Sequence, residues 1–99
     1  MASVYILFSK KLNSYYTGSC RDLDIRLEEH KSKKFKKSFT ARADDWQLML
    51  SIDDLEYAQA RQIEKYIKRM KSRIYIEQLL KDPDRVDLLI DAHTRWRSR

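Results

Sequence analysis

Clusters and alternations of apolar residues predict three strands in the first half of the chain. Residues 4–8 are a β-branched and aromatic run, and residues 15–18 form a second aromatic run after a polar, turn-rich stretch. Such runs favour β-strands, and their short connection predicts a β-hairpin over residues 3–18. Residues 46–52 alternate between polar and apolar side chains well enough to predict a third strand.

Gly18, the only glycine among the 99 residues, closes the second of these runs. Glycine permits backbone angles and close approaches that a Cβ forbids. Strand periodicity places Tyr5 and Leu7 on one face of the first strand, and it places Tyr16 on the same face of the second strand as Gly18. If the register aligns these faces, Tyr5 and Tyr16 lie on neighbouring strands beside the glycine.

A helix is predicted directly after the hairpin. Asp22 is a candidate N-cap, and apolar residues then recur at helical spacing. Arg26 and His30 are four residues apart, so they share one face of this helix. Residues 31–40 follow and contain five lysines that repel one another, which predicts an exposed, mobile loop.

The second half of the chain is predicted to be helical. Asp53 or Asp54 caps a long helix from about residue 55 to residue 70, whose core-facing stripe steps by three and four through Ala60, Ile63, Ile67, Met70 and Ile74. A short helix follows over residues 74–80. The sequence Asp82-Pro83-Asp84 ends it, because proline cannot continue a helix. A last amphipathic helix is predicted over residues 84–97.

These elements predict an α+β fold: a small, mostly antiparallel three-stranded sheet flanked by helices. Ninety-nine residues form one domain, with no room for a second core. We expect the principal domain to span residues 1–83. Residues 84–99 are expected to add a C-terminal helix and a basic tail packed on the same domain.

The charge balance favours a polyanionic partner. Lys and Arg number 21 against 15 Asp and Glu, which gives a net charge of +6 and a pI near 9.5. Nucleic acid is the simplest such partner, although a basic protein without one is an equally good reading of charge alone. Cys20 is the only cysteine, so it forms no internal disulfide and fits a reducing cytoplasm. No apolar run approaches the ~18 residues of a membrane span, which predicts no membrane association.

Five side chains have the chemistry that hydrolysis of a phosphodiester requires: Tyr5, Tyr16, Arg26, His30 and Glu64. A carboxylate can hold a metal that neutralises the phosphate. The planar guanidinium of arginine matches phosphate oxygens, and a base must take a proton from water. Tyrosine is a poor base at its usual pKa of about 10, but a nearby metal and arginine would favour its phenolate.

Each of these residues also has an ordinary structural explanation. The two tyrosines could form a cross-strand aromatic pair. Arg26 and His30 could form a solvated helix face, and Glu64 could pair with Lys68 at i, i+4. Only the order of the residues, together with the single glycine, favours a shared site.

That order resembles the GIY-YIG nuclease family over residues 3–83. The two strand signatures read Ser3-Val4-Tyr5 and Tyr16-Thr17-Gly18. The further resemblances are Asp22-Leu23-x-x-Arg26-Leu27-x-x-His30, then Thr40 followed by Trp46-x-Leu48, and finally Ala60-x-x-x-Glu64-x-x-Ile67-Lys68. Two departures are visible. Ser3 replaces the glycine of the first signature, and residues 81–84 lack the asparagine that many members carry near the end of the domain.

The resemblance implies a small stand-alone endonuclease that hydrolyses DNA in a metal-dependent reaction, with a role in repair or recombination. Tyr5 would be the general base, helped by His30. Tyr16 would position water or phosphate, and Arg26 would bind the scissile phosphate. Glu64 would hold a single Mg²⁺ or Mn²⁺.

DNA contacts are expected from six lysines in two regions: Lys33, Lys34, Lys36 and Lys37 in the loop, and Lys68 and Lys71 on the long helix. Two alternatives from other classes remain. One is a non-catalytic nucleic-acid-binding module with the same fold, which metal-dependent cleavage would distinguish. The other is an adaptor that docks a larger repair protein through an apolar stripe on the helix at 84–97.

Overall fold

The computed structural model describes residues 1–32 and 39–94 and confirms the predicted α+β fold. Three strands form one antiparallel sheet in the order β2-β1-β3: β1 (Ala2–Ser9), β2 (Ser14–Cys20) and β3 (Gln47–Leu55). The described residues also form four α-helices and a short 3₁₀ helix: α1 (Leu23–Lys31), η1 (Phe39–Arg42), α2 (Tyr57–Met70), α3 (Arg73–Lys81) and α4 (Pro83–Ala92).

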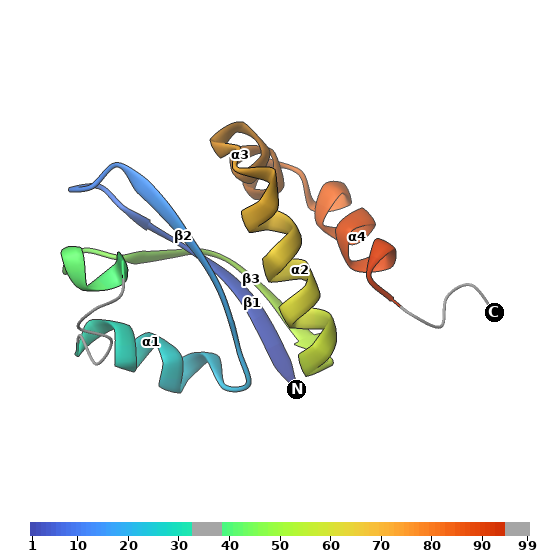
Figure 1. Ribbon diagram of the computed structural model, residues 1–99, viewed down its shortest axis with the longest axis horizontal. Helices are drawn as coiled ribbons and strands as arrows, with labels where there is room; N and C mark the ends of the chain where they lie inside the picture. Colours follow the sequence, from blue (N-terminus) through green and yellow to red (C-terminus); the bar gives the residue numbers. More distant parts are fainter. Residues whose placement is uncertain (33–38, 95–99) are drawn as a thin grey trace.

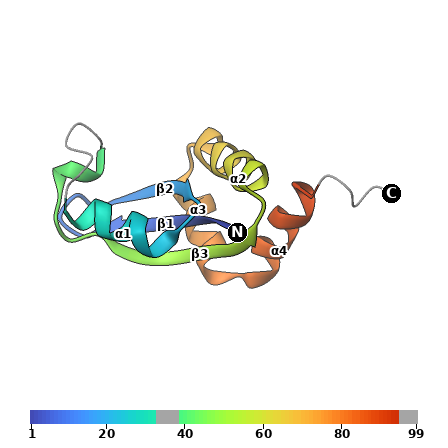
Figure 2. The same cartoon turned by 90° about the horizontal axis from the view of Figure 1, so that it is seen from below.

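The helices cover the sheet from two sides. Figure 1 shows α1 on one side of the sheet and α2, α3 and α4 on the other, and Figure 2 shows the same layers from below. The larger core lies under α2 and includes Val4, Ile6 and Ile63. The smaller core contains Tyr5 and Leu7. Strand parity therefore sends alternate residues of β1 into different cores, and it sends Tyr5 toward the α1 side.

The hairpin forms as predicted, with longer strands. Tyr5 pairs with Gly18 and Leu7 pairs with Tyr16, so these four residues share one face of the sheet. The prediction that Gly18 closes its strand is wrong, because β2 continues to Cys20. Gly18 also lacks a positive φ. Gly18 is therefore needed because the strand has no space for a side chain at this position, and not because of its backbone angles.

The expected cap of the long helix is also wrong. Asp53 and Asp54 belong to β3, and the N-cap of α2 is Glu56, in a capping box with Gln59. Asp53 instead accepts a hydrogen bond of 2.8 Å from the Ser3 hydroxyl. Asp54 takes a left-handed φ of 59° near a register shift between β1 and β3. Both carboxylates thus lie in an irregular strand end, where the pairing of β1 and β3 shifts in register.

The apolar stripe of α2 ends earlier than predicted. Ala60, Ile63 and Ile67 are buried, whereas Met70 is 42% exposed and Ile74 is 69% exposed. Lys71 has a left-handed φ of 47° as the C-cap of α2, and this turn redirects the chain before α3 begins. Ile74, beyond this cap, therefore leaves the stripe, and Met70, the last residue of the helix, is already partly exposed.

Local signals correctly placed the start of α1 and the break before α4. The Asp22 side chain accepts a hydrogen bond from the Ile25 amide at the start of α1. Pro83 is the first residue of α4, after Asp82 as its N-cap. The last helix ends at Ala92 rather than at residue 97. None of the helices in the described ranges is long and apolar enough to cross a bilayer.

Candidate active site

The close packing of Tyr5 against Gly18 explains the single glycine. A Cβ built on Gly18 would lie 2.5 Å from Cζ of Tyr5 and 3.0 Å from its Cε1. Both distances are shorter than an ordinary carbon–carbon contact of about 3.5–4.0 Å. The ring of Tyr5 is 0% exposed and occupies the space that a side chain at position 18 would need. Glycine therefore lets the tyrosine lie flat across the neighbouring strand.

A chain of buried polar contacts fixes the hydroxyl end of Tyr5. The hydroxyl lies 2.9 Å from Nε2 of His30, and Nδ1 of His30 lies 2.9 Å from the hydroxyl of Thr40. The backbone carbonyl of Thr40 accepts a hydrogen bond of 2.7 Å from the Trp46 indole. His30 and Thr40 are both buried. The imidazole therefore has a polar partner at each nitrogen and a single orientation.

Burial sets the protonation of this pair. It raises the pKa of Tyr5 well above its ordinary value, and the Arg26 guanidinium, which hydrogen-bonds the hydroxyl, lowers that pKa by less. The expectation that Arg26 would favour the phenolate is thus outweighed by desolvation. Burial and then the charge of Arg26 lower the pKa of His30. At neutral pH, Tyr5 keeps its proton while His30 is neutral and can accept one.

Arg26 reaches the same region from the first turns of α1. Its Nη1 donates a hydrogen bond of 3.3 Å to the carbonyl of Ser19, and its Nε lies 3.2 Å from the carboxylate of Glu29. The side chain is 34% exposed. Arg26 therefore touches both the buried tyrosine and the surface, a position from which a guanidinium can meet a phosphate.

Glu64 approaches β2 from α2. Its side chain is only 13% exposed and accepts hydrogen bonds from the Ser19 hydroxyl and from Nζ of Lys68, the latter at 2.8 Å. Nη1 of Arg61 lies 3.7 Å from the same carboxylate. The predicted pairing with Lys68 is thus present, and the contact with Ser19 adds a direct connection to the strand that carries Gly18.

Tyr16 lies between the histidine and the lysine. Its ring centroid is 6.4 Å from that of Tyr5 and 5.6 Å from that of His30. Nζ of Lys68 lies 5.3 Å from the centre of the ring. The predicted residues are therefore grouped around β2, and two contact routes join Glu64 to Tyr5: through Ser19 and Arg26, and through Lys68 and Tyr16.

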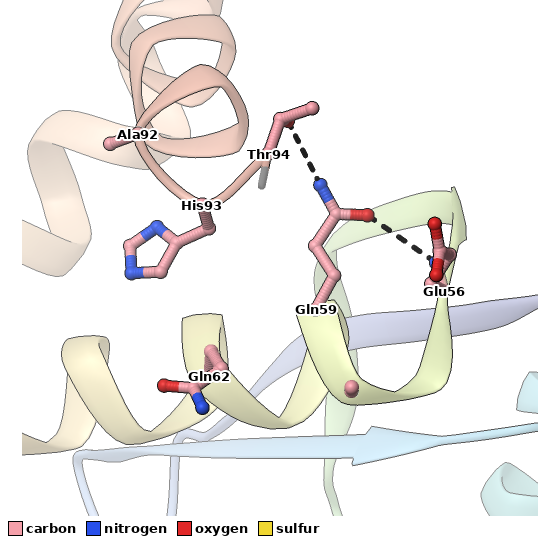
Figure 3. A pocket seen from close by; sticks show the side chains of 7 residues that line it. Glu56, Gln59, Gln62, Ala92, His93 and Thr94 are labelled. Carbon is pink, nitrogen blue, oxygen red and sulfur yellow. Dashed lines mark hydrogen bonds between the residues drawn. The ribbon is translucent and has the colours of Figure 1, made fainter. Parts of the chain in front are cut away.

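Three of the five predicted residues line cavities, each a different one, and Tyr5 and Glu64 line none of the cavities described. Arg26 lines one beside the start of α1, His30 lines another between α1 and β3, and Tyr16 and Lys68 line a third. A fourth cavity, of about 540 Å³, lies between the first turns of α2 and the end of α4. Figure 3 shows its polar lining, where Gln59 hydrogen-bonds Thr94. None of the five predicted residues lines this fourth cavity.

The oxygen donors near β2 fit a hydrated divalent cation. Mg²⁺ demands oxygen ligands, keeps several waters and commonly binds through one or two carboxylates. Glu64 supplies one carboxylate, from which Lys68 would have to withdraw. Among residues 1–32 and 39–94, no group of three or more His, Cys, Asp and Glu could hold an ion. One carboxylate is compatible with a single divalent ion that keeps most of its waters.

The lysines predicted to bind DNA divide into two groups. Lys68 and Lys71 lie on the last turn and C-cap of α2, where both line the cavity that also contains Tyr16. The other four lie outside the described residues: Lys33, Lys34, Lys36 and Lys37.

Ser19 was missed as a site residue by sequence reasoning, and Thr40 entered only through the family resemblance. Ser19 connects Arg26 and Glu64 through its carbonyl and its hydroxyl. Its position directly after Gly18 was the only available signal. Thr40 contacts His30 across ten residues. That contact depends on how η1 folds back, which periodicity does not report.

The architecture and the order of these residues define the class of the protein, a small α+β domain of the nuclease type. The model of the GIY-YIG catalytic domain matches residues 1–77, which run from β1 into α3, and the chain belongs to this nuclease family. No curated protein and no solved structure matches the chain.

Proposed function

We propose that the protein is a metal-dependent endonuclease that hydrolyses phosphodiester bonds of DNA. The observation that carries this proposal is the Tyr5–His30 contact, which is held by Thr40 and touched by Arg26. A buried hydroxyl with a neutral imidazole at hydrogen-bonding distance is the arrangement expected of a proton-transfer pair. An aromatic pair that served packing alone would not need it.

In this mechanism His30 carries its proton on Nδ1, which donates to the Thr40 hydroxyl, and Nε2 accepts from the Tyr5 hydroxyl. The Tyr5 oxygen takes a proton from the attacking water while its own proton passes to Nε2. The water oxygen forms a bond to phosphorus, and the bond from phosphorus to the leaving sugar oxygen breaks. Proton transfer of this kind contributes about 10²–10⁴-fold to rates.

Access to Tyr5 requires movement of Arg26. The hydroxyl is fully buried and Arg26 hydrogen-bonds it, so water reaches the oxygen only after the guanidinium shifts. A phosphate at the surface would attract the guanidinium away from Tyr5, because the pair of charges is stronger than a bond to a neutral phenol. Binding of the scissile phosphate would thereby expose the base, and Arg26 would remain on the phosphate through the transition state.

Glu64 would hold the metal, with Tyr16 and Lys68 beside it. A bound Mg²⁺ or Mn²⁺ would neutralise charge on the phosphate and stabilise the departing oxygen. Glu64 would hold the ion in place of its present partner Lys68, whose ammonium would then be available to a phosphate oxygen. Tyr16 would position water or phosphate at the edge of β2.

The proposal is tested by incubating a panel of labelled DNA structures with Mg²⁺, Mn²⁺ or EDTA. The wild type is expected to cleave at least one structure in a metal-dependent manner, and Glu64→Ala is expected to abolish cleavage with little loss of DNA affinity. Asp87→Ala is the matched control, because Asp87 is an exposed carboxylate on α4, away from the site and from the cavities beside it. If Glu64→Ala cleaves as well as Asp87→Ala does, the proposed role of Glu64 is wrong.

The wider setting is also a proposal. Repair or recombination, a larger repair protein as partner and a cytoplasmic location are consistent with a basic nuclease-type domain that has a free, buried Cys20. A non-catalytic nucleic-acid-binding module is the alternative. It predicts DNA binding in EDTA and no cleavage of any structure in the panel.

A further inference from the structure

A basic groove lies next to the candidate active site, between the hairpin turn and the junction of α2 with α3. Its volume is about 420 Å³. Its lining includes Lys68, Lys71 and Arg73, and no Asp or Glu is among the described residues that line it. The separated elements that meet here therefore bring three cations to one concave surface.

The backbone holds these cations in place. Lys71 is fixed in a left-handed conformation as the C-cap of α2, and Arg73 is the first residue of α3. Arg73 donates hydrogen bonds of 2.9 Å to both the carbonyl and the side-chain oxygen of Asn13, in the hairpin turn. Its guanidinium also lies 5.3 Å from the centre of the Tyr15 ring. Arg73 thus joins the two walls of the groove.

The positive end of α3 adds to this field. Ser72 caps the helix and lines the groove, so the first amides of α3 lie beside Lys71. A helix N-terminus carries a partial positive charge that attracts anions. The Glu77 carboxylate lies 3.3 Å from the Arg73 guanidinium and offsets part of its charge. Substitution of Lys71 therefore tests the charge of the groove more directly than substitution of Arg73 does.

The groove continues from the residues proposed for catalysis. Lys68 lies 2.8 Å from the Glu64 carboxylate and also lines the groove with Tyr16. Lys71 follows Lys68 by three residues, at the C-cap of α2, and Arg73 follows at the start of α3. A strand with one phosphate beside Glu64 and Tyr16 would therefore meet Lys71 and Arg73 as it continued along the groove.

We propose that this groove binds the phosphates of the cleaved nucleic-acid strand on one side of the scissile bond. The inference rests on the proposed function, because it takes the position of the scissile phosphate from Glu64 and Tyr16. It also gives the path of the bound nucleic-acid strand across the protein. The strand runs from the active site toward the hairpin turn, over the C-terminal end of α2.

Lys71→Asn tests the groove, because asparagine removes the charge and tolerates the left-handed conformation. Lys81→Asn is the matched control, a lysine lost from the exposed far end of α3. Binding of labelled single-stranded and duplex DNA would be measured in EDTA between about 50 and 200 mM NaCl. Cleavage by the same proteins would be measured with Mg²⁺.

On duplex DNA, log K falls as log salt rises, with a slope of about −0.9 for each phosphate contact. Lys71→Asn should therefore make this slope less negative by about 0.9, because one phosphate contact is lost. Between about 50 and 200 mM NaCl, that variant should then lose about 3.5-fold less affinity than the wild type. Lys81→Asn should keep the wild-type slope. In cleavage, Lys71→Asn should raise KM and leave kcat unchanged, because a phosphate contact remote from the scissile bond stabilises the bound substrate and the transition state equally.

The two proposals fail separately. A Lys71→Asn slope equal to that of Lys81→Asn overturns the groove, even where Glu64-dependent cleavage supports the nuclease. A lessened slope in a protein that cleaves nothing supports the groove as a phosphate site and removes the proposed function. Absence of DNA binding by the wild type overturns the groove outright.

Discussion

Gly18→Ala is the substitution whose effect follows most directly from the structure. The added Cβ would lie 2.5 Å from Cζ of Tyr5, about 1 Å closer than ordinary contact. The tyrosine ring is fully buried and its hydroxyl is held by His30, so it cannot swing into solvent. Gly18 has no positive φ, and alanine therefore brings no backbone strain. The whole penalty comes from the collision with one ring.

The size of the penalty can be estimated from two opposing effects. Overpacking a core costs about 1–3 kcal/mol. Replacing glycine with alanine in a compatible conformation returns about 0.4–1 kcal/mol by restricting the unfolded chain. The net destabilisation is then about 1–2 kcal/mol, which lowers Tm by about 5–15 °C in a domain of this size. A ring displaced by about 1 Å would also slow cleavage by about a hundredfold.

Thermal unfolding and a double-mutant cycle measure this effect. In a Tyr5→Leu background the aromatic ring is absent, so Gly18→Ala should cost little or nothing. The coupling free energy between the two sites should therefore be about as large as the single-mutant penalty. DNA affinity should change little, since neither residue is a proposed phosphate contact. A Gly18→Ala protein that is as stable and as active as the wild type would refute the reasoning, as would equal penalties in both backgrounds.

Two further predictions concern His30. Thr40→Val removes the hydroxyl beside Nδ1 of His30 at nearly constant volume, so the imidazole can adopt the other tautomer. This substitution should lower kcat by about 10- to 100-fold and change the pH profile of cleavage. An unchanged pH profile would show that Thr40 serves packing alone. The lowered pKa of His30 predicts that the wild type holds its full stability above about pH 6.5 and loses part of it at lower pH, as the unfolded state takes up the proton first. Chemical denaturation across this range should show the loss in the wild type and not in His30→Gln, and identical pH dependence in both would contradict it.

Local signals were enough to predict the hairpin, the start of α1 and the break before α4. Asp22 and Pro83 act within one turn of their own helices, so their roles are visible in the sequence. Asp53 and Asp54 misled the prediction because an acidic residue before a helix resembles a cap. Their true place depends on pairing between β3 and β1, which is distant along the chain. The left-handed Lys71 gave no signal, since glycine usually occupies such a position.

The sequence predicted which residues form the candidate site better than it predicted their burial, contacts and pKa values. The face shared by Tyr5 and Tyr16 follows from strand parity, given the register. The complete burial of Tyr5, and the rise in its pKa that results, depends on how α1 and η1 pack over the sheet. The connection of Arg26 to Glu64 through Ser19 joins residues that are far apart along the chain. No periodicity reports such contacts.

The central claim is that the Tyr5 hydroxyl transfers the proton in metal-dependent cleavage, and single-turnover kinetics of Tyr5→Phe test it most directly. Phenylalanine keeps the buried ring and removes the hydroxyl. Tyr66→Phe is a matched control, because Tyr66 is a partly exposed tyrosine of α2 that packs toward α3 and α4, away from the site. Tyr5→Phe should reduce the cleavage rate by about 10²–10⁴-fold, with DNA affinity close to that of the wild type. Because the buried Nε2 of His30 loses its partner, Tyr5→Phe should also lower the stability by about 1–3 kcal/mol, so the rates are compared at a temperature where both proteins are folded. A Tyr5→Phe protein that cleaves within a few-fold of Tyr66→Phe would contradict the claim.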